Sequence, residues 1–137
     1  MHKRSFVITM TAVAIAAGTA TAQFGYVPWR VNALPGNGNF EVVEGPGAGN
    51  QRYWCEAAKF ARDRLRVRGN TRMYIINPEG RSQTQANSYG VGFTVDPSPE
   101  VLEAAKSAGG YSVSITKIGY NLSVSHSQSF CGANVLF

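Results

Sequence analysis

One segment, Gln51 to Arg66, has the periodicity of an amphipathic α-helix and constrains the fold more than any other part of the chain. At about 100° per residue its apolar side chains fall in one broad arc. The arc consists of Tyr53, Trp54, Ala57, Ala58, Phe60, Ala61 and Leu65. Asn50 is the expected N-cap, and Gly69-Asn70 is the expected stop signal. The small alanines in the middle of the arc favour close packing of this helix on a sheet.

The rest of the chain consists mainly of short extended segments separated by glycine and proline turns, a pattern that predicts strands. Val27 to Leu34 and Phe40 to Glu44 predict a hairpin with a five-residue loop. Further strands are expected at Arg72 to Asn77, Ser88 to Asp96 and Tyr111 to Ile118, with a turn at Pro78-Glu79-Gly80. A short second helix is expected from Pro99 to about Ser107, capped by Ser98.

The segment Leu122 to Phe130 fits two structures. Its serines alternate as on one side of a strand, whereas Leu122, His126 and Phe130 are spaced by four as in a helix. Whether this segment is a strand or a helix, the expected strands are joined by short connections, except where a helix lies between them. The sequence therefore predicts an α+β fold, with an antiparallel sheet of about five to six strands and one main helix packed on one face.

Residues 1–22 have the pattern of a secretory signal peptide. Lys3 and Arg4 precede an uncharged, mostly apolar stretch, which ends in the small residues Ala20-Thr21-Ala22. Cleavage near Ala22 would leave residues 23–137 as one globular domain, exported to the periplasm or the medium of a bacterium. Loss of Lys3 and Arg4 lowers the formal net charge from +5 to +3. No other apolar run approaches the roughly 18 residues of a membrane span.

The chain has two cysteines, Cys55 and Cys131. Export to an oxidising compartment predicts a single disulfide between them. It would close a loop of about 77 residues and contribute roughly 4–5 kcal/mol by loop-closure entropy. Cys55 lies on the flank of the helix, so its partner segment must wrap around the helix side. The alternative is a cysteine nucleophile with His126 as its base, which requires a free thiol.

Few residues suit catalysis. His126 is the only histidine after the signal peptide, and a small hydrolase using His126 is the alternative to a non-enzymatic domain. A serine triad lacks the G-x-S-x-G motif, and too few ligands are present to predict a metal site or a cofactor. Glu41 and Glu44 are expected to face water, so no carboxylate pair is predicted in a cleft.

A basic cluster has more functional content, because five arginines lie between Arg62 and Arg72. The candidate residues for binding an anion or a partner are Arg52, Lys59, Arg62, Arg66 and Arg68. All but the last would share one stripe of the helix, and arginine forks suit carboxylate, phosphate or sulfate groups. The expected partner is an anionic envelope polymer or an acidic protein, because export and a mild net charge disfavour nucleic acid. The competing interpretation is a solvated helix face with pairs such as Glu56–Lys59 and Lys59–Asp63.

Several short motifs resemble a group of small exported alphaproteobacterial proteins of unknown function. They are Tyr53-Trp54-Cys55-Glu56-Ala57-Ala58, Val91-Gly92-Phe93-Thr94, Asn121-Leu122-Ser123-Val124-Ser125-His126 and Phe130-Cys131. The resemblance implies a signal peptide and a paired Cys55 and Cys131, and it implies no activity, substrate or catalytic residue. The expected function is therefore a small exported, non-enzymatic binding module of the cell envelope.

Overall fold

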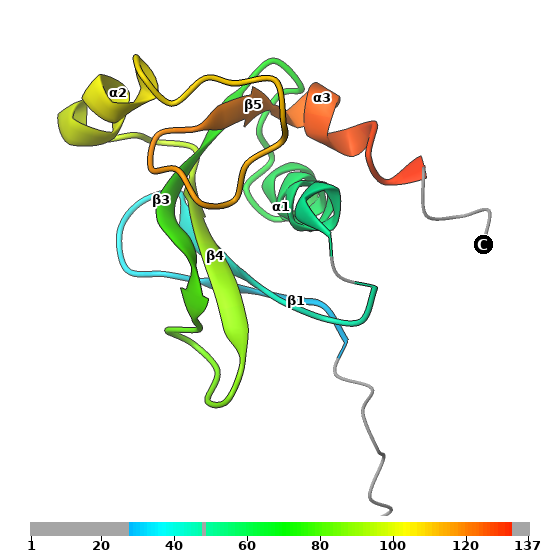
Figure 1. The fold of residues 1–137 in the computed structure, drawn as a ribbon. Coiled ribbons are helices and arrows are strands. Elements are labelled where there is room, and N and C mark those ends of the chain that lie inside the picture. The colour runs from blue at the N-terminus through cyan, green and yellow to red at the C-terminus, as the bar shows by residue number, and fades with distance from the viewer. Residues whose placement is uncertain (1–27, 48, 133–137) are drawn as a thin grey trace, which may run out of the picture.

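The computed structural model describes residues 28–47 and 49–132, so the expected signal peptide lies outside the described residues. The elements follow one another along the chain in the order strand, strand, helix, strand, strand, helix, strand, helix (Figure 1). They are β1 (Arg30–Ala33), β2 (Asn39–Val43), α1 (Asn50–Asp63), β3 (Arg72–Arg81), β4 (Tyr89–Thr94), α2 (Pro99–Ala105), β5 (Asn121–Ser123) and α3 (Val124–Gln128).

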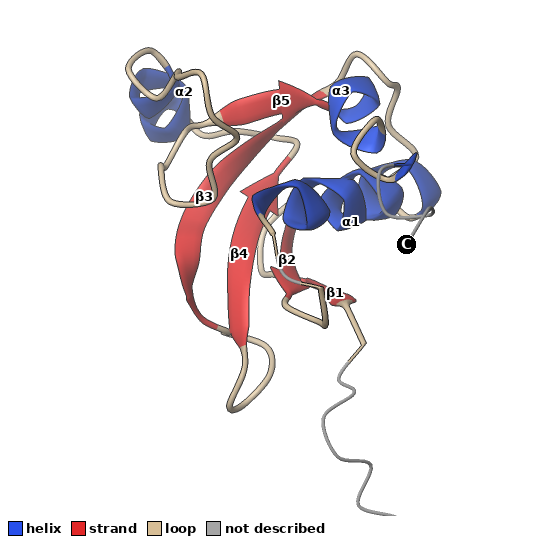
Figure 2. Cartoon of the chain, turned by 45° about the vertical axis from the view of Figure 1, so that its right-hand side comes forward, coloured by secondary structure: helices blue, strands red, loops and turns tan. Residues whose placement is uncertain are grey.

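The five strands form one antiparallel sheet in the order β1-β2-β4-β3-β5. β1 and β2 form the expected hairpin, in which Arg30 pairs with Val43 and Ala33 with Phe40. α1 packs on one face of the sheet with α3 beside it, whereas α2 lies beyond the edge formed by β3 and β5 (Figures 1 and 2). The predicted α+β fold, with one main helix on one face of an antiparallel sheet, is confirmed.

The core between α1 and the sheet is aromatic. Trp54 is fully buried, and its ring centroid lies 4.9 Å from that of Phe93 and 5.5 Å from that of Tyr120. Its indole N–H donates a hydrogen bond to the carbonyl oxygen of Ser114 at 2.9 Å, so the buried donor has a partner. The helix approaches the strands closely through three fully buried small residues, Ala57, Ala58 and Ala61.

α1 ends at Asp63, earlier than the predicted end at Arg66. Arg66 adopts a left-handed conformation with φ 57°, and the N–H of Val67 donates to the carbonyl oxygen of Ala61 at 3.1 Å. This closure is common at helix C-termini, where glycine usually takes the left-handed position. The stop predicted at Gly69-Asn70 was wrong because an arginine adopts that conformation first.

The start of α1 also differs from the prediction. Gly49 is the N-cap and supplies no side-chain bond, so the prediction of Asn50 as N-cap is wrong. The Asn50 amide instead donates to the carbonyl oxygen of Val113 at 2.8 Å. This bond attaches the beginning of α1 to the long segment that precedes β5.

β3 is longer than predicted, and it includes residues 78–80, which were wrongly expected to form a turn. Its pairing with β4 shifts register on both sides of Asn77, as in a β-bulge, and such an irregularity accommodates Pro78 in a strand. Residues 111–118 form no strand, contrary to the prediction. This segment is attached to β3 by single backbone hydrogen bonds, such as the one from the N–H of Glu79 to the carbonyl oxygen of Ile115 at 2.8 Å.

Residues 122–130, which fit both a strand and a helix, contain both. β5 ends at Ser123, whose hydroxyl accepts a hydrogen bond from the N–H of His126 at 3.1 Å and so caps α3. A serine in this role is a common N-cap because its oxygen satisfies a free N–H of the first turn. Val124 and Ser127 are the buried residues of the short helix.

Tyr53 provides a test of the packing beneath α1. Its side chain is 1% exposed, and its hydroxyl lies near the Glu44 carboxylate but makes no hydrogen bond of good geometry among the described residues. Burial, together with the negative charges of Glu44 and Glu79, raises the pKa of this hydroxyl above its ordinary 10.0. Because an unsatisfied buried hydroxyl costs free energy, we expect Tyr53→Phe to keep or increase stability by up to ~1 kcal/mol in urea unfolding. A loss of more than ~1 kcal/mol would show that the hydroxyl has a stabilising partner.

Candidate functional site

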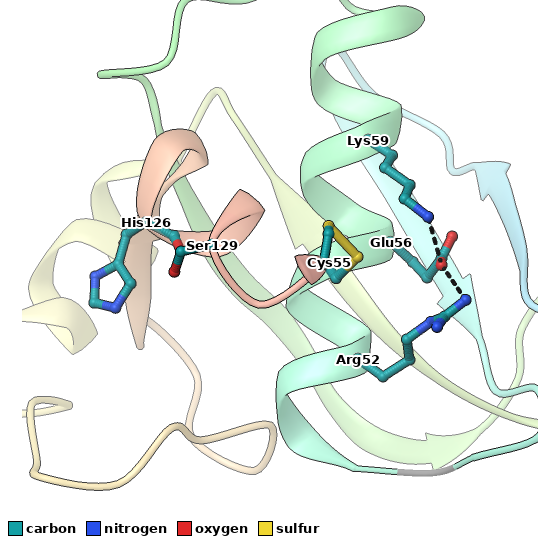
Figure 3. Close-up of a disulfide and its surroundings, with 7 residues drawn as sticks. Arg52, Cys55, Glu56, Lys59, His126 and Ser129 are labelled. Atoms are coloured by element: carbon teal, nitrogen blue, oxygen red, sulfur yellow. Dashed lines mark hydrogen bonds and ion pairs between the residues drawn. A yellow bond between two sulfur atoms is a disulfide. The ribbon is translucent and has the colours of Figure 1, made fainter. Parts of the chain in front are cut away.

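The disulfide between Cys55 and Cys131 is present and joins α1 to the turn that follows α3 (Figure 3). The two Cα atoms are 5.1 Å apart, and the bridge spans 76 positions of sequence. Cys55 lies on the flank of the helix but is only 1% exposed, because α3 and the turn after it cover that flank. The described part of the chain therefore has no free thiol, which removes the cysteine-nucleophile alternative.

Two of the five predicted anion-binding residues are already paired. Arg52 Nη2 lies 2.8 Å from Glu56 Oε1, and Lys59 Nζ lies 3.3 Å from the same oxygen (Figure 3). The Arg52 guanidinium also lies over the ring of Trp29, 5.7 Å from its centroid. The expected Glu56–Lys59 pair is confirmed, and the Lys59–Asp63 pair does not form. Both cations form ion pairs within α1, so their charges are already partly neutralised.

The arginines at and beyond the end of α1 differ from that pair. Arg62, Arg64, Arg66 and Arg68, here called the arginine segment, are all exposed. No ion pair among the described residues involves them. The predicted helix stripe that included Arg66 does not exist, because the helix ends before that residue. The predicted candidate set did not include Arg64, which is exposed like its neighbours.

The arginine segment has a defined backbone. Leu65 and Val67 alternate with the arginines and pack, partly buried, against the core. The N–H of Ser125 donates to the carbonyl oxygen of Gly69 at 2.9 Å, which places the start of α3 beside the end of the segment. The Ser125 hydroxyl fills the space that a side chain on Gly69 would need, and Arg62 Nη1 lies 3.5 Å from the same position. Arg62, the turn at Gly69 and α3 therefore meet at one place.

His126, the residue of the predicted hydrolase alternative, is exposed on α3. Its ring packs on Phe130 with centroids 5.3 Å apart, and it points away from the disulfide (Figure 3). Within residues 28–47 and 49–132, its ring nitrogens take part in no hydrogen bond and no ion pair. A catalytic base requires a nucleophile within reach and an orienting group, and no described residue forms a hydrogen bond with the His126 ring in either role.

Residues 28–47 and 49–132 contain neither a metal-binding cluster nor a membrane-spanning helix. No group of three or more His, Cys, Asp or Glu side chains among them is arranged to hold a metal ion. None of the described helices combines the length and the apolar character needed to span a bilayer.

A buried carboxylate is the feature that the sequence prediction missed. Glu41 on β2 was expected to face water but is 2% exposed. Its carboxylate accepts hydrogen bonds from the hydroxyl of Ser82 at 2.6 Å, from the N–H of Gln83 at 2.9 Å, and from the N–H and hydroxyl of Thr84 at 3.2 and 2.6 Å. The Asn32 amide on β1 donates to the same Thr84 hydroxyl at 2.9 Å. One side chain thus holds the loop between β3 and β4 against the neighbouring hairpin.

The pKa of Glu41 reflects this environment. Burial by itself raises the pKa of a carboxyl group, because it disfavours the charged form. Here the hydrogen bonds from Ser82, from Thr84 and from the backbone of Gln83 outweigh burial, so the pKa of Glu41 lies below its ordinary 4.5. Glu41 is therefore an ionised carboxylate at neutral pH.

The sequence did contain a signal for this burial. In β4, Gly90 and Gly92 alternate with Val91 and Phe93, so two successive positions on one side of that strand carry no side chain. A Cβ atom on Gly90 would lie 2.9 Å from the carboxylate carbon of Glu41. Two glycines on one face of a strand indicate that other groups pack there closely. At Gly90 that group is Glu41, and at Gly92 it is the side chain of Asn77.

The fold and its surface together define a class: a small α+β domain with one disulfide, an exposed arginine segment and a loop held by a buried carboxylate. Comparisons of the chain with protein-family models, with curated proteins and with solved structures found no match.

Proposed function

We propose that this protein is a small exported, non-enzymatic binding domain that uses the arginine segment to bind an anionic partner. The observation that carries the proposal is that its four guanidinium groups are exposed and are free of ion pairs among the described residues. Asp63 is the only acidic residue between Arg62 and Arg72. Guanidinium groups without a carboxylate partner can form charge-assisted hydrogen bonds with carboxylate, phosphate or sulfate groups.

The position of the segment supports binding rather than helix stabilisation alone. Cations near a helix C-terminus compensate the helix dipole, and this effect falls off within the last turn. Arg62 lies in that last turn of α1, but Arg66 and Arg68 lie beyond it. The partly buried Leu65 and Val67 hold the backbone in place, so less entropy is lost when a partner binds.

Export is part of the proposal. The sequence pattern of residues 1–22 predicts a signal peptide, and a disulfide is the expected state of paired cysteines in an oxidising compartment. An anionic polymer of the bacterial envelope or an acidic protein is the partner that this location and this surface suggest.

Heparin, as a sulfated polymer, and polyglutamate, as an acidic polypeptide, are suitable probes. We expect the double substitution Arg64→Gln and Arg68→Gln to weaken binding to at least one of them about tenfold, which corresponds to the loss of roughly 1.4 kcal/mol of contacts. Dissociation constants should be measured at two salt concentrations, because ionic contacts weaken as salt is added.

The matched control removes the same charge from elsewhere by Lys106→Gln and Lys117→Gln, at two exposed lysines outside the segment. These changes should leave binding within about twofold of the unsubstituted protein. An equal loss in both variants would mean that only net charge matters. Unchanged binding in the arginine variant would contradict the proposal.

A further inference from the structure

The loop between β3 and β4 projects beyond the helices at one end of the sheet, yet its shape is closely defined (Figure 2). Besides the bonds to Glu41, the N–H of Ser82 donates to the carbonyl oxygen of Ser88 at 2.8 Å. The N–H of Gln85 donates to the Ser82 hydroxyl at 3.0 Å. A surface loop that is ordered in advance by a buried carboxylate loses little conformational entropy on binding a ligand.

This loop forms a pocket of about 500 Å³ with the strand ends beside it. That volume falls within the range of roughly 300–1,000 Å³ found for small-molecule sites. The pocket is lined by Arg81, Ser82, Ala86, Asn87, Ser88 and Tyr89. Most of these residues offer polar groups, and such a lining favours a hydroxylated or charged ligand over an apolar one.

Two of the lining residues stand directly opposite each other. Arg81 on β3 pairs with Tyr89 on β4, so both side chains lie on the same face of the hairpin. Tyr89 is 57% exposed, and Arg81 takes part in no ion pair among the described residues. An exposed tyrosine and an arginine without an ion pair thus share one face of the hairpin at the pocket.

We propose that this pocket binds a carboxylated sugar. The apolar face of the sugar ring would pack on Tyr89, and its carboxylate would pair with Arg81 through charge-assisted hydrogen bonds. Asn87 and Ser88 supply amide and hydroxyl groups for the sugar hydroxyls. A single guanidinium beside a single ring matches one uronate unit. This site shares no residue with the arginine segment and stands independently of it.

The test is a titration of the isotope-labelled oxidised protein with a galacturonate trimer, followed by NMR of the backbone amides. We expect shifts at residues 81–89, and at least tenfold weaker binding in both Arg81→Gln and Tyr89→Ala. Tyr111→Ala removes a second exposed tyrosine, which lies outside this pocket, and should leave binding unchanged. A neutral maltotriose should bind at least tenfold more weakly, because it cannot pair with Arg81.

Three results would overturn the inference. Absence of shifts at residues 81–89 would show that the pocket does not bind a uronate. Equal binding of maltotriose would remove the role of the guanidinium. Shifts confined to residues 62–68 would place the ligand on the arginine segment, which would support the proposed function while excluding this second site.

Discussion

Replacing Cys55 and Cys131 by alanine is expected to lower the free energy of unfolding by about 4 kcal/mol. The bridge spans 76 positions, and the loop-closure model assigns roughly 4–5 kcal/mol to a loop of that size. Reduction of the unsubstituted protein should have a similar effect, because it frees the same loop. Urea unfolding of the oxidised, reduced and substituted proteins measures all three values. A difference below ~1 kcal/mol between the oxidised protein and the other two would show that packing holds α3 and the following turn in place without the bridge.

Hydrogen exchange of the reduced protein should show which part of the structure loosens first. α3 has only five residues and is too short to be stable alone. It lies beside α1, and the disulfide joins the turn after it to that helix (Figure 3). We therefore expect the amides of α3 to lose hydrogen-exchange protection on reduction, while those of β2 and β4 keep most of theirs. Uniform loss across the protein would mean that α3 unfolds only with the whole domain.

The second large effect is expected for Glu41→Gln, which should lower the free energy of unfolding by about 2–3 kcal/mol. Hydrogen bonds to a charged acceptor are strong, and the substitution would leave their buried donors without that acceptor. Both carboxylate oxygens accept bonds, Oε1 from Ser82 and Thr84 and Oε2 from the N–H of Gln83. A glutamine has one oxygen, so its amide group would face at least one donor. Glu79→Gln, at an exposed position, is the control and should stay within ~0.5 kcal/mol.

Acid should reproduce part of this loss. The pKa of Glu41 is lower in the folded protein than its ordinary 4.5, so the folded state binds fewer protons near that pH than the unfolded state does. The stabilisation that ionised Glu41 contributes is fully present above the pKa of this residue in the unfolded chain. It is lost as the pH falls through the lower pKa of Glu41 in the folded protein. We expect the stability of the unsubstituted protein to decline below about pH 4.5 and that of Glu41→Gln to decline less. Parallel pH profiles would contradict the role given to Glu41.

Much of the fold could be predicted because its signals are local. The hairpin of β1 and β2 follows from a turn between two extended segments, and α1 follows from its apolar arc. α2 begins as expected, with Ser98 as N-cap and Pro99 in the first turn. Each of these patterns acts over a few neighbouring residues, so the sequence alone is sufficient to recognise it.

The errors arise where distant contacts override local preference. β3 continues through Pro78 because β4 pairs with it on both sides of a bulge. Residues 111–118 have the alternation of a strand but meet β3 only through isolated bonds. Arg66 takes a left-handed conformation that sequence reasoning assigns to glycine, and the partial burial of Leu65 and Val67 helps hold that turn in place.

Contacts seen only in the tertiary structure also altered the predicted set of anion-binding residues. Arg52 and Lys59 have the charge of a binding site, but Glu56 lies between them and pairs with both. Arg64, which was left out of the predicted set, is exposed with its neighbours in the arginine segment. Composition and spacing showed that arginines were concentrated here, and only the positions of the carboxylates showed which of them were unpaired.

The sequence by itself determined the α+β class, the single disulfide and the concentration of arginine after the main helix, because periodicity, cysteine number and charge are properties of the chain itself. Tertiary structure alone decided that Glu41 is buried and that it orders the β3–β4 loop. A strand pattern shows which residues alternate, but it does not show what covers the second face. At Glu41 the cover is a loop some forty positions away, and its donors make a buried charge stable.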